Sequence, residues 1–167
     1  MTGEVLIARG RSAIGKGVVY GLGKGGLWPL DKLPCRSSAK LVNGVAKTAL
    51  WCDCSGFVAW VLGRSRKDSK DWPWWLSTDS VYDDAKDDGK HVLFTKLDKA
   101  EPGCLAVYSD WKDADGTHHE GHIAVVSDPA LHLVIDCSSS QNGIAEHAQP
   151  VFWSEHHAVI FCAYRGS

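Results

Sequence analysis

The second half of the chain contains four short runs of β-branched and aromatic residues, and these runs restrict the fold more than any other feature. The runs are Cys104–Tyr108, His122–Ser127, His132–Ser138 and Ala158–Tyr164. Runs of this length are typical of strands, and the Gly, Pro, Asp and Asn residues between them favour turns. Because such turns connect antiparallel neighbours, the pattern predicts an antiparallel meander.

The first half of the chain contains the helical patterns. Glu4–Ile14 has apolar residues at helical spacing, and Cys54–Leu62 is apolar on most sides and is followed by Gly63, a typical helix stop. The sequence also predicts helices over Ser38–Leu50 and Thr78–Asp88. Helices that precede an antiparallel sheet are typical of the α+β class, in which they pack on one face of the sheet. We therefore expect an α+β fold in a single domain over residues 1–167.

Composition and charge narrow the class of function. The 18 basic and 20 acidic side chains give a net charge of −2, which gives no reason to expect nucleic acid or an anionic membrane as a partner. No stretch approaches the roughly 20 apolar residues that span a bilayer. Some of the tryptophans cluster beside Pro or Asp, a setting typical of a packed core or of a groove wall. These are Trp72, Trp74, Trp75 and Trp111.

Two cysteines, Cys52 and Cys54, lie one residue apart in the stretch WCDCSGFVAW. Zinc sites prefer about two to four residues between paired cysteines, so this spacing is a poor match. His118, His119 and His122 in HHEGH do not follow the H-E-x-x-H pattern, and they lie in a glycine-containing loop. We therefore expect no metal and no cofactor. Because the sequence shows no secretory signal, we expect its six cysteines to be free thiols and not disulfides.

Cys54 is the better candidate for a reactive thiol. It lies where a loop turns into the predicted helix, and the unpaired N–H groups and dipole at such a position stabilise a thiolate. Ser55 and Gly56 are small and leave its sulfur accessible. Cys52 lies outside that helix and lacks this stabilisation. The alternative is an inert Cys54, because free cysteine is among the most buried residue types.

A nucleophilic thiol needs a base within hydrogen-bond reach and a group that orients the base. His122 follows Gly121 at the start of a predicted strand, where its ring can project over the end of the sheet. The next predicted strand contains Asp136 in an otherwise apolar run, and a buried acid is costly unless it is paired. Neighbouring strands of a meander would place Asp136 beside His122. Asp136 would then hold one ring nitrogen, and the other would face the thiol.

Four segments together resemble the NlpC/P60 family of papain-like cysteine peptidases, namely DCSGFVAWV, EPGCLAVYSD, GHIAVVSD and LVIDCSSSQNG. The resemblance extends over Tyr20–Tyr164, and Asp53–Phe57 is its most specific part. It implies the papain-like NlpC/P60 fold, with N-terminal helices packed on a C-terminal antiparallel sheet. It also implies Cys54 as nucleophile, His122 as base and Asp136 in the third catalytic position.

The chain departs from the family pattern at two positions. Cys104 follows the Pro-Gly turn, where the family usually has Asp. The third catalytic position, commonly His, Asn or Gln, is Asp136 here, and Ser138 and Gln141 in the same segment are the alternatives. The gap between Tyr20 and the nucleophile is also longer than usual, which implies an insertion that reshapes one wall of the groove.

The resemblance implies hydrolysis of amide bonds in peptidoglycan stem peptides, typically the bond between D-glutamate and a diamino acid. Tyr20, Asp53 and Ser55 are the implied contacts to a free amine of the substrate. Two other classes of function remain open. The same scaffold without catalysis would be a module that binds peptides or cell wall, although the complete set of Cys, His and acid argues against it. Related papain-like folds also hydrolyse or transfer lipid acyl groups.

The N-terminal segment MTGEVLIARGRSAIG has an early acid and lacks a long apolar core, so it does not resemble a secretory signal. We expect synthesis in the cytoplasm and export by a non-classical route to the periplasm or cell wall. A toxin delivered by a secretion machine, a phage lysin and a recycling peptidase all fit, and the first is favoured. A delivered toxin implies an immunity protein that covers the groove at Cys54.

Overall fold

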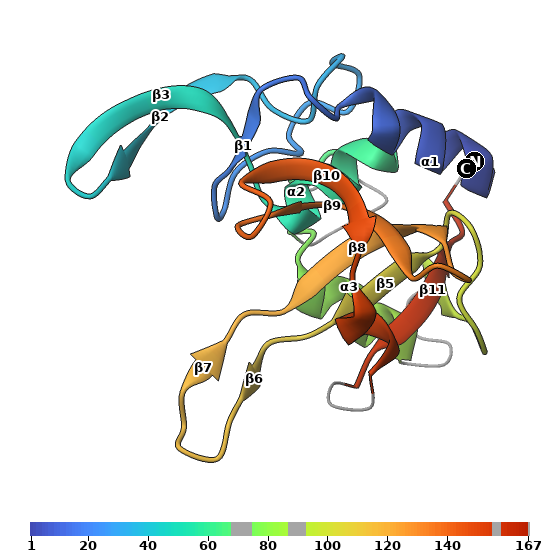
Figure 1. The fold of residues 1–167 in the computed structure, drawn as a ribbon. Coiled ribbons are helices and arrows are strands. Elements are labelled where there is room, and N and C mark those ends of the chain that lie inside the picture. Colours follow the sequence, from blue (N-terminus) through green and yellow to red (C-terminus); the bar gives the residue numbers. More distant parts are fainter. Residues whose placement is uncertain (68–74, 87–92, 155–157, 167) are drawn as a thin grey trace.

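The computed structural model describes residues 1–67, 75–86, 93–154 and 158–166, which form helices, one large sheet and two small sheets (Figure 1). The helices are α1 (Gly3–Ser12), α2 (Cys54–Val61), α3 (Thr78–Lys86) and the 3-10 helix η1 (Pro150–Trp153). The large sheet consists of β4 (Phe94–Lys96), β5 (Leu105–Tyr108), β8 (His122–Asp128), β9 (Leu133–Ser138), β10 (Gly143–Ala148) and β11 (Ile160–Tyr164). The small sheets consist of β1 (Val18–Tyr20), β2 (Ser37–Val42) and β3 (Val45–Cys52), and of β6 (Trp111–Lys112) and β7 (His118–His119). The predicted α+β class is thus confirmed.

The strands of the large sheet lie in the order β10-β9-β8-β5-β11-β4, and neighbouring strands are antiparallel. All four runs that the sequence marks as strands lie in this sheet. From β5 through β8 to β9 the chain forms a meander, as predicted, and β10 continues it. β11 departs from the meander, because it returns to pair with the far side of β5 instead of extending the sheet beyond β10. The sequence analysis did not predict β4 or β10.

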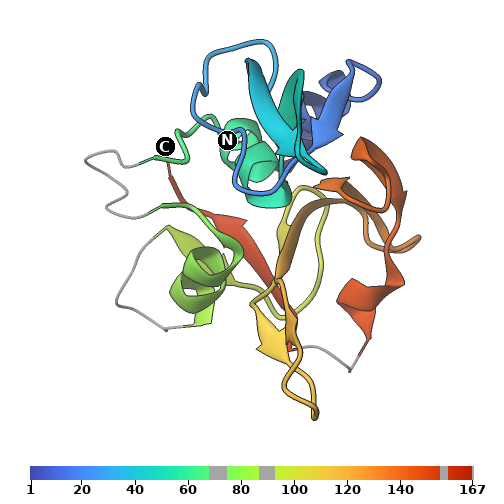
Figure 2. The ribbon, with the colours of Figure 1, turned by 90° about the vertical axis from the view of Figure 1, so that its left-hand side faces the viewer.

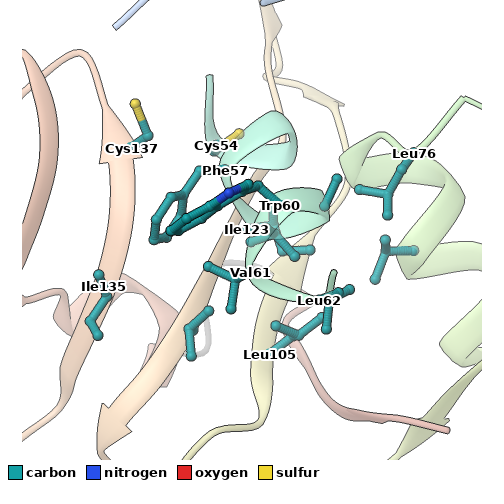
Figure 3. Close-up of a cluster of buried hydrophobic side chains, with 14 of the residues drawn as sticks. Cys54, Phe57, Trp60, Val61, Leu62, Leu76, Leu105, Ile123, Ile135 and Cys137 are labelled. Carbon is teal, nitrogen blue, oxygen red and sulfur yellow. The ribbon is translucent and has the colours of Figure 1, made fainter. Parts of the chain in front are cut away.

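Helix α2 lies in the centre of the hydrophobic core. Asp53 is its N-cap, and its side chain accepts a hydrogen bond from the Gly56 N–H at 2.7 Å. Every residue of the helix is buried, because the helix packs against β8, β9 and α1. Figure 3 shows Phe57 and Val61 of the helix among side chains of the sheet, including Ile123. This packing fixes the place at which the helix begins.

The segment Ser38–Leu50, predicted as a helix, is instead part of a β-hairpin. β2 and β3 pair antiparallel, and the turn between them is formed by Asn43 and Gly44, whose φ angles are 52° and 77°. Positive φ at both central residues is what a tight two-residue hairpin turn requires, and Asn-Gly is its preferred sequence. The helical prediction was wrong because this turn signal outweighs the spacing of the apolar residues.

The β2–β3 hairpin projects from the body of the molecule, as does the short ribbon of β6 and β7 (Figure 1). The inner end of β3 pairs in parallel with β1, with Tyr20 opposite Cys52. β1 also contacts β9 and β10, so the small sheet lies against one end of the large sheet (Figure 2). Tyr20 is thereby brought next to the start of α2.

Among the helices that the structure describes, none is long and apolar enough to cross a bilayer.

The core position of Phe57 leads to a prediction about stability. Its side chain is fully buried, and truncation would leave a cavity between α2 and the sheet. We expect Phe57→Ala to lower the free energy of unfolding, measured by chemical denaturation, by about 3–5 kcal/mol. Leu41→Ala, on the exposed hairpin, is the control and should change it by less than about 0.5 kcal/mol. Equal losses in the two variants would contradict the assigned core.

Candidate active site

The thiol of Cys54 lies at the first residue of α2, at the edge of a cavity of about 220 Å³. Asp53 ends the preceding extended segment, and its capping of the helix sets the direction in which the Cys54 side chain leaves the backbone. Tyr20 of β1 and Ser55 of α2 also line this cavity. The first N–H groups of a helix have no partner within the helix. The sulfur therefore lies at the N-terminal end of the helix beside the cavity, although only 6% of Cys54 is exposed.

His122, the first residue of β8, connects Cys54 to Asp136 of β9. Its Nε2 lies 2.7 Å from Oδ2 of Asp136, and its side chain also forms a hydrogen bond with that of Cys54. Because Nε2 is held by the carboxylate, Nδ1 is the nitrogen that faces the thiol. The side chain of Asp136 has no exposed surface, and that of His122 is 13% exposed. The structure thus brings together the three residues predicted for the catalytic positions.

Burial and charge act in opposite directions on this pair. Burial lowers the pKa of His122, but its hydrogen bonds to Asp136 and Cys54 outweigh burial and raise that pKa to about 10. Burial raises the pKa of Asp136, but hydrogen bonds from His122 and His147 outweigh it and lower that pKa. The favoured state is therefore a carboxylate beside an imidazolium.

Two aromatic side chains fix the orientation of the His122 ring. Phe152 of η1 stacks on it, with ring centroids 5.7 Å apart and an angle of 20° between the planes. Tyr108 of β5 lies on another side, with its centroid at 6.3 Å. Both rings restrict rotation of the imidazole, so that each nitrogen keeps its partner.

His147 is a residue of this cluster that the sequence analysis missed. Its Nε2 lies 3.1 Å from Oδ1 of Asp136, so the carboxylate is held by one histidine on each side. In the register of β9 and β10, Asp136 lies opposite Ala145, and His147 follows two residues later on the same face. Recognition of GIAEHA as a strand would have suggested this contact, but the segment contains few β-branched residues.

The alternatives for the third position lie elsewhere. The Ser138 hydroxyl lies 3.3 Å from that of Ser140, with which it shares a hydrogen bond. Gln141 is an exposed residue of the turn between β9 and β10. Of the three candidates, Asp136 is the one that contacts the ring of His122.

Asp53 and Ser55 belong to a buried network around Arg66. Oδ2 of Asp53 accepts a hydrogen bond from the Gly23 N–H at 2.7 Å. Both carboxylate oxygens of Asp53 also accept hydrogen bonds from Nη1 of Arg66, each at 2.8 Å. Nη2 of Arg66 donates to the Ser55 hydroxyl at 2.7 Å. The charge of Asp53 is thus balanced within the protein. Both residues still line the cavity beside Cys54, and their contact with a substrate amine stays a prediction.

Arg66 was not singled out in the sequence, because it lies in a polar segment that resembles an ordinary loop. Its guanidinium lies over the ring of Trp75, 4.7 Å from the centroid. Trp111, on the projecting ribbon, stacks on His119 with centroids 4.1 Å apart. Trp72 and Trp74 lie outside the described residues.

A second cavity of about 230 Å³ lies beside His122. His122 and Tyr108 line it, and it shares Tyr20, Glu120 and Gly121 with the first cavity. Burial raises the pKa of Tyr20, as do the negative charges of Cys54 and Glu120, so its phenol stays a hydrogen-bond donor. The two cavities therefore adjoin one another along the wall that these shared residues form.

All six cysteines lie in the described part of the chain and are free, buried thiols. Cys35 forms a hydrogen bond with Cys52, and the Cys137 thiol donates to the Cys52 carbonyl oxygen at 3.2 Å. Burial raises the pKa of the Cys52 thiol well above its ordinary value. Cys52 is therefore a packed interior residue. Within the residues described, no three His, Cys, Asp or Glu side chains are grouped to hold a metal ion.

The Arg66 network leads to a second prediction about stability. Arg66→Leu leaves the Asp53 carboxylate buried without its cation, and we expect a loss of about 3–5 kcal/mol in the free energy of unfolding. The matched control is Arg36→Leu, which breaks an exposed pair with Asp31 and should have a much smaller effect. Similar losses in the two variants would show that Arg66 does not act through its buried charge.

The fold and the site can be compared with known proteins. No family model and no curated protein matches the sequence. Among solved structures, NlpC1 from Trichomonas vaginalis matches 96% of this chain with a TM-score of 0.50 and 14% identity. The peptidoglycan hydrolase RipB from Mycobacterium tuberculosis matches 96% of it with a TM-score of 0.54 and 21% identity. The chain spans 42% of the NlpC1 chain and 63% of the RipB chain. At these identities the likeness is one of fold, and the chain therefore has the NlpC/P60 fold that its motifs imply.

Proposed function

We propose that this protein is a cysteine hydrolase that cuts amide bonds in peptidoglycan stem peptides. The observation that carries the proposal is the position of His122, which is hydrogen bonded to Asp136 through Nε2 and to the Cys54 thiol on its other side. A nucleophile, a base and an orienting group in contact are the arrangement that acyl transfer by a thiol requires. RipB, which shares the fold, is described as a peptidoglycan hydrolase.

In the resting site, the proton of Cys54 is held on Nδ1 of His122, and the raised pKa of His122 favours this ion pair. In the first step, the Cys54 thiolate attacks the carbonyl carbon of the scissile amide. The N–H of Cys54, at the start of α2, is suited to donate a hydrogen bond to the oxyanion that forms. Tyr20 lines both cavities beside the thiol, and its protonated phenol is a further donor.

In the second step, the tetrahedral intermediate collapses. The C–N bond breaks, and the imidazolium of His122 gives its proton to the leaving amine. The resulting thioester is then attacked by water, which His122 deprotonates as a general base. Collapse of the second intermediate restores the thiolate beside the imidazolium and releases the carboxylic acid. Throughout these steps the carboxylate of Asp136 stabilises the charged ring and holds its orientation.

The charge of the groove supports a substrate that carries an amine. Asp79, Asp110 and Glu120 line the cavity beside Cys54, together with Asp53. Arg66 balances Asp53, and Nε2 of His118 lies 3.1 Å from Oδ2 of Asp110, so the negative charge of this wall comes mainly from Asp79 and Glu120. A stem peptide carries an amine on the side chain of its diamino acid, and a second one on its first residue once the peptide is released from the sugar. We infer that the D-glutamyl–diamino acid bond is cut. Delivery as a toxin by a non-classical route, and an immunity protein that covers this groove, belong to the same proposal.

Purified muropeptides test the function directly, with products identified by mass spectrometry. We expect the wild type to cleave them and Cys54→Ala to lose at least about 10³-fold in rate, because the nucleophile is gone. Cys52→Ala is the matched control two positions away and should keep most of the activity. Cleavage by Cys54→Ala at the wild-type rate would rule out the cysteine mechanism. If the wild type binds muropeptides without cleaving them, the protein is a binding module. If it instead releases fatty acid from lipid substrates, it is an acyl hydrolase.

The pH dependence of the rate tests the contact between His122 and Asp136. Loss of the His122 proton removes the general acid, so the wild-type kcat/KM should fall as the pH rises through about 10. Asp136→Asn removes the negative charge that favours the imidazolium, so its alkaline limb should move to lower pH. An unchanged alkaline limb in Asp136→Asn would contradict the assigned contact. The pH–rate profile of both proteins makes the comparison.

A further inference from the structure

The carboxylate of Asp136 is held on both sides, and its second partner is His147 on β10. We propose that His147 is a positioning residue for the reaction, which fixes the Asp136 carboxylate so that the carboxylate in turn fixes the ring of His122. The inference rests on the proposed function for its effect on hydrolysis. Its effect on the reactivity of the Cys54 thiol can be measured without a substrate.

Burial makes the second contact of Asp136 necessary. The Asp136 side chain has no exposed surface, and it lies on a strand in the middle of the core. A buried carboxylate oxygen without a donor is costly, because no water replaces the missing hydrogen bond. Oδ2 accepts from His122 at 2.7 Å, and Oδ1 accepts from His147 at 3.1 Å. Without His147, Oδ1 would lose this donor, and the carboxylate would be free to rotate away from His122.

The backbone holds these three side chains in a row. β9 lies between β8 and β10, so Asp136 has one neighbouring strand on each side. Val125 pairs with Ile135 between β8 and β9, and Asp136 pairs with Ala145 between β9 and β10. His122 and His147 therefore lie diagonally across from Asp136, on the same face of the sheet. The three strands are hydrogen-bonded neighbours, so they hold the spacing of these side chains more rigidly than loops would.

Charge around His147 favours this pairing over its alternatives. The hydrogen bond to Asp136 raises the pKa of His147, while its burial and the positive charge of His122 act in the opposite direction. The adjacent Glu146 is held by Arg11, whose Nη2 lies 2.6 Å from Oε1, so Glu146 does not compete for the ring. His147 keeps part of its surface exposed, with 16% of the side chain accessible. The His147 ring thus lies between the buried Asp136 carboxylate and the solvent.

Two kinds of variant separate a positioning role from simple packing. His147→Leu keeps the bulk of the ring but lacks a donor, and His147→Asn has an amide too short to reach Oδ1. His147→Gln places an amide N–H close to the position of Nε2 and should restore most of what the other two lose. Thermal unfolding of each variant shows whether the protein is folded before rates are compared.

The variants are compared by two readouts, kcat and KM on muropeptides and the rate at which iodoacetamide alkylates Cys54. We expect His147→Leu and His147→Asn to lower kcat and the alkylation rate about tenfold, the effect of one hydrogen bond to a charged group, with KM within about twofold. His147→Gln should recover both rates to within about threefold of wild type. Tandem mass spectrometry locates the adduct on Cys54 and not on another thiol.

A double-mutant cycle tests whether His147 acts through Asp136. In the background of Asp136→Asn, His147→Leu should have almost no further effect, because the carboxylate that it positions is absent. An undiminished effect in that background would overturn the proposal. Wild-type rates in both His147→Leu and His147→Asn would overturn it too. If the wild type fails to cleave muropeptides, the proposed function fails, while the alkylation rates still decide the part of His147.

Discussion

The hydrogen-bonded carboxylate of Asp136 is the interaction on which the site depends. A bare carboxylate at this depth would destabilise the sheet, and pairing with two histidines makes its burial tolerable. The same pairing raises the pKa of His122 and lowers that of Asp136. One interaction therefore stabilises the strand and prepares the base, which links the stability of the sheet to the chemistry at Cys54.

A second buried charge fixes the other half of the site. Asp53 caps α2, binds the Gly23 N–H and pairs with Arg66, so it ties the loop after β1, the helix and the segment after the helix to one carboxylate. The sulfur of Cys54 is placed by this network, and the ring of His122 is placed by the sheet. The nucleophile and the base are thus positioned by separate networks that meet only across the groove.

The central features of this fold could be predicted from the sequence because they depend on local patterns. The strands β5, β8, β9 and β11 are short runs of β-branched residues, and α2 is an apolar segment with an Asp before it and a Gly soon after it. The order of β8 and β9 was enough to suggest that His122 and Asp136 are neighbours. The β2–β3 hairpin was missed because apolar spacing was given more weight than the Asn43-Gly44 turn.

Contacts between distant segments could not be predicted in this way. His147 lies in a strand with little β-branched character, and Arg66 lies in a segment that has no regular pattern. Each becomes visible only when the register of a sheet or the path of a loop brings it to a buried carboxylate. Long-range charge pairing of this kind leaves no periodic signal in a single sequence.

The ionisation state of His122 is the property on which the coupling of Asp136 to Cys54 depends. NMR titration of the ring nitrogens would measure it in the resting protein, without a substrate and without assuming a reaction. We expect the His122 ring to stay protonated through neutral pH and to lose its proton at about pH 10. A ring that loses its proton near the ordinary histidine value of 6.5 would contradict the assigned contacts with Asp136 and Cys54.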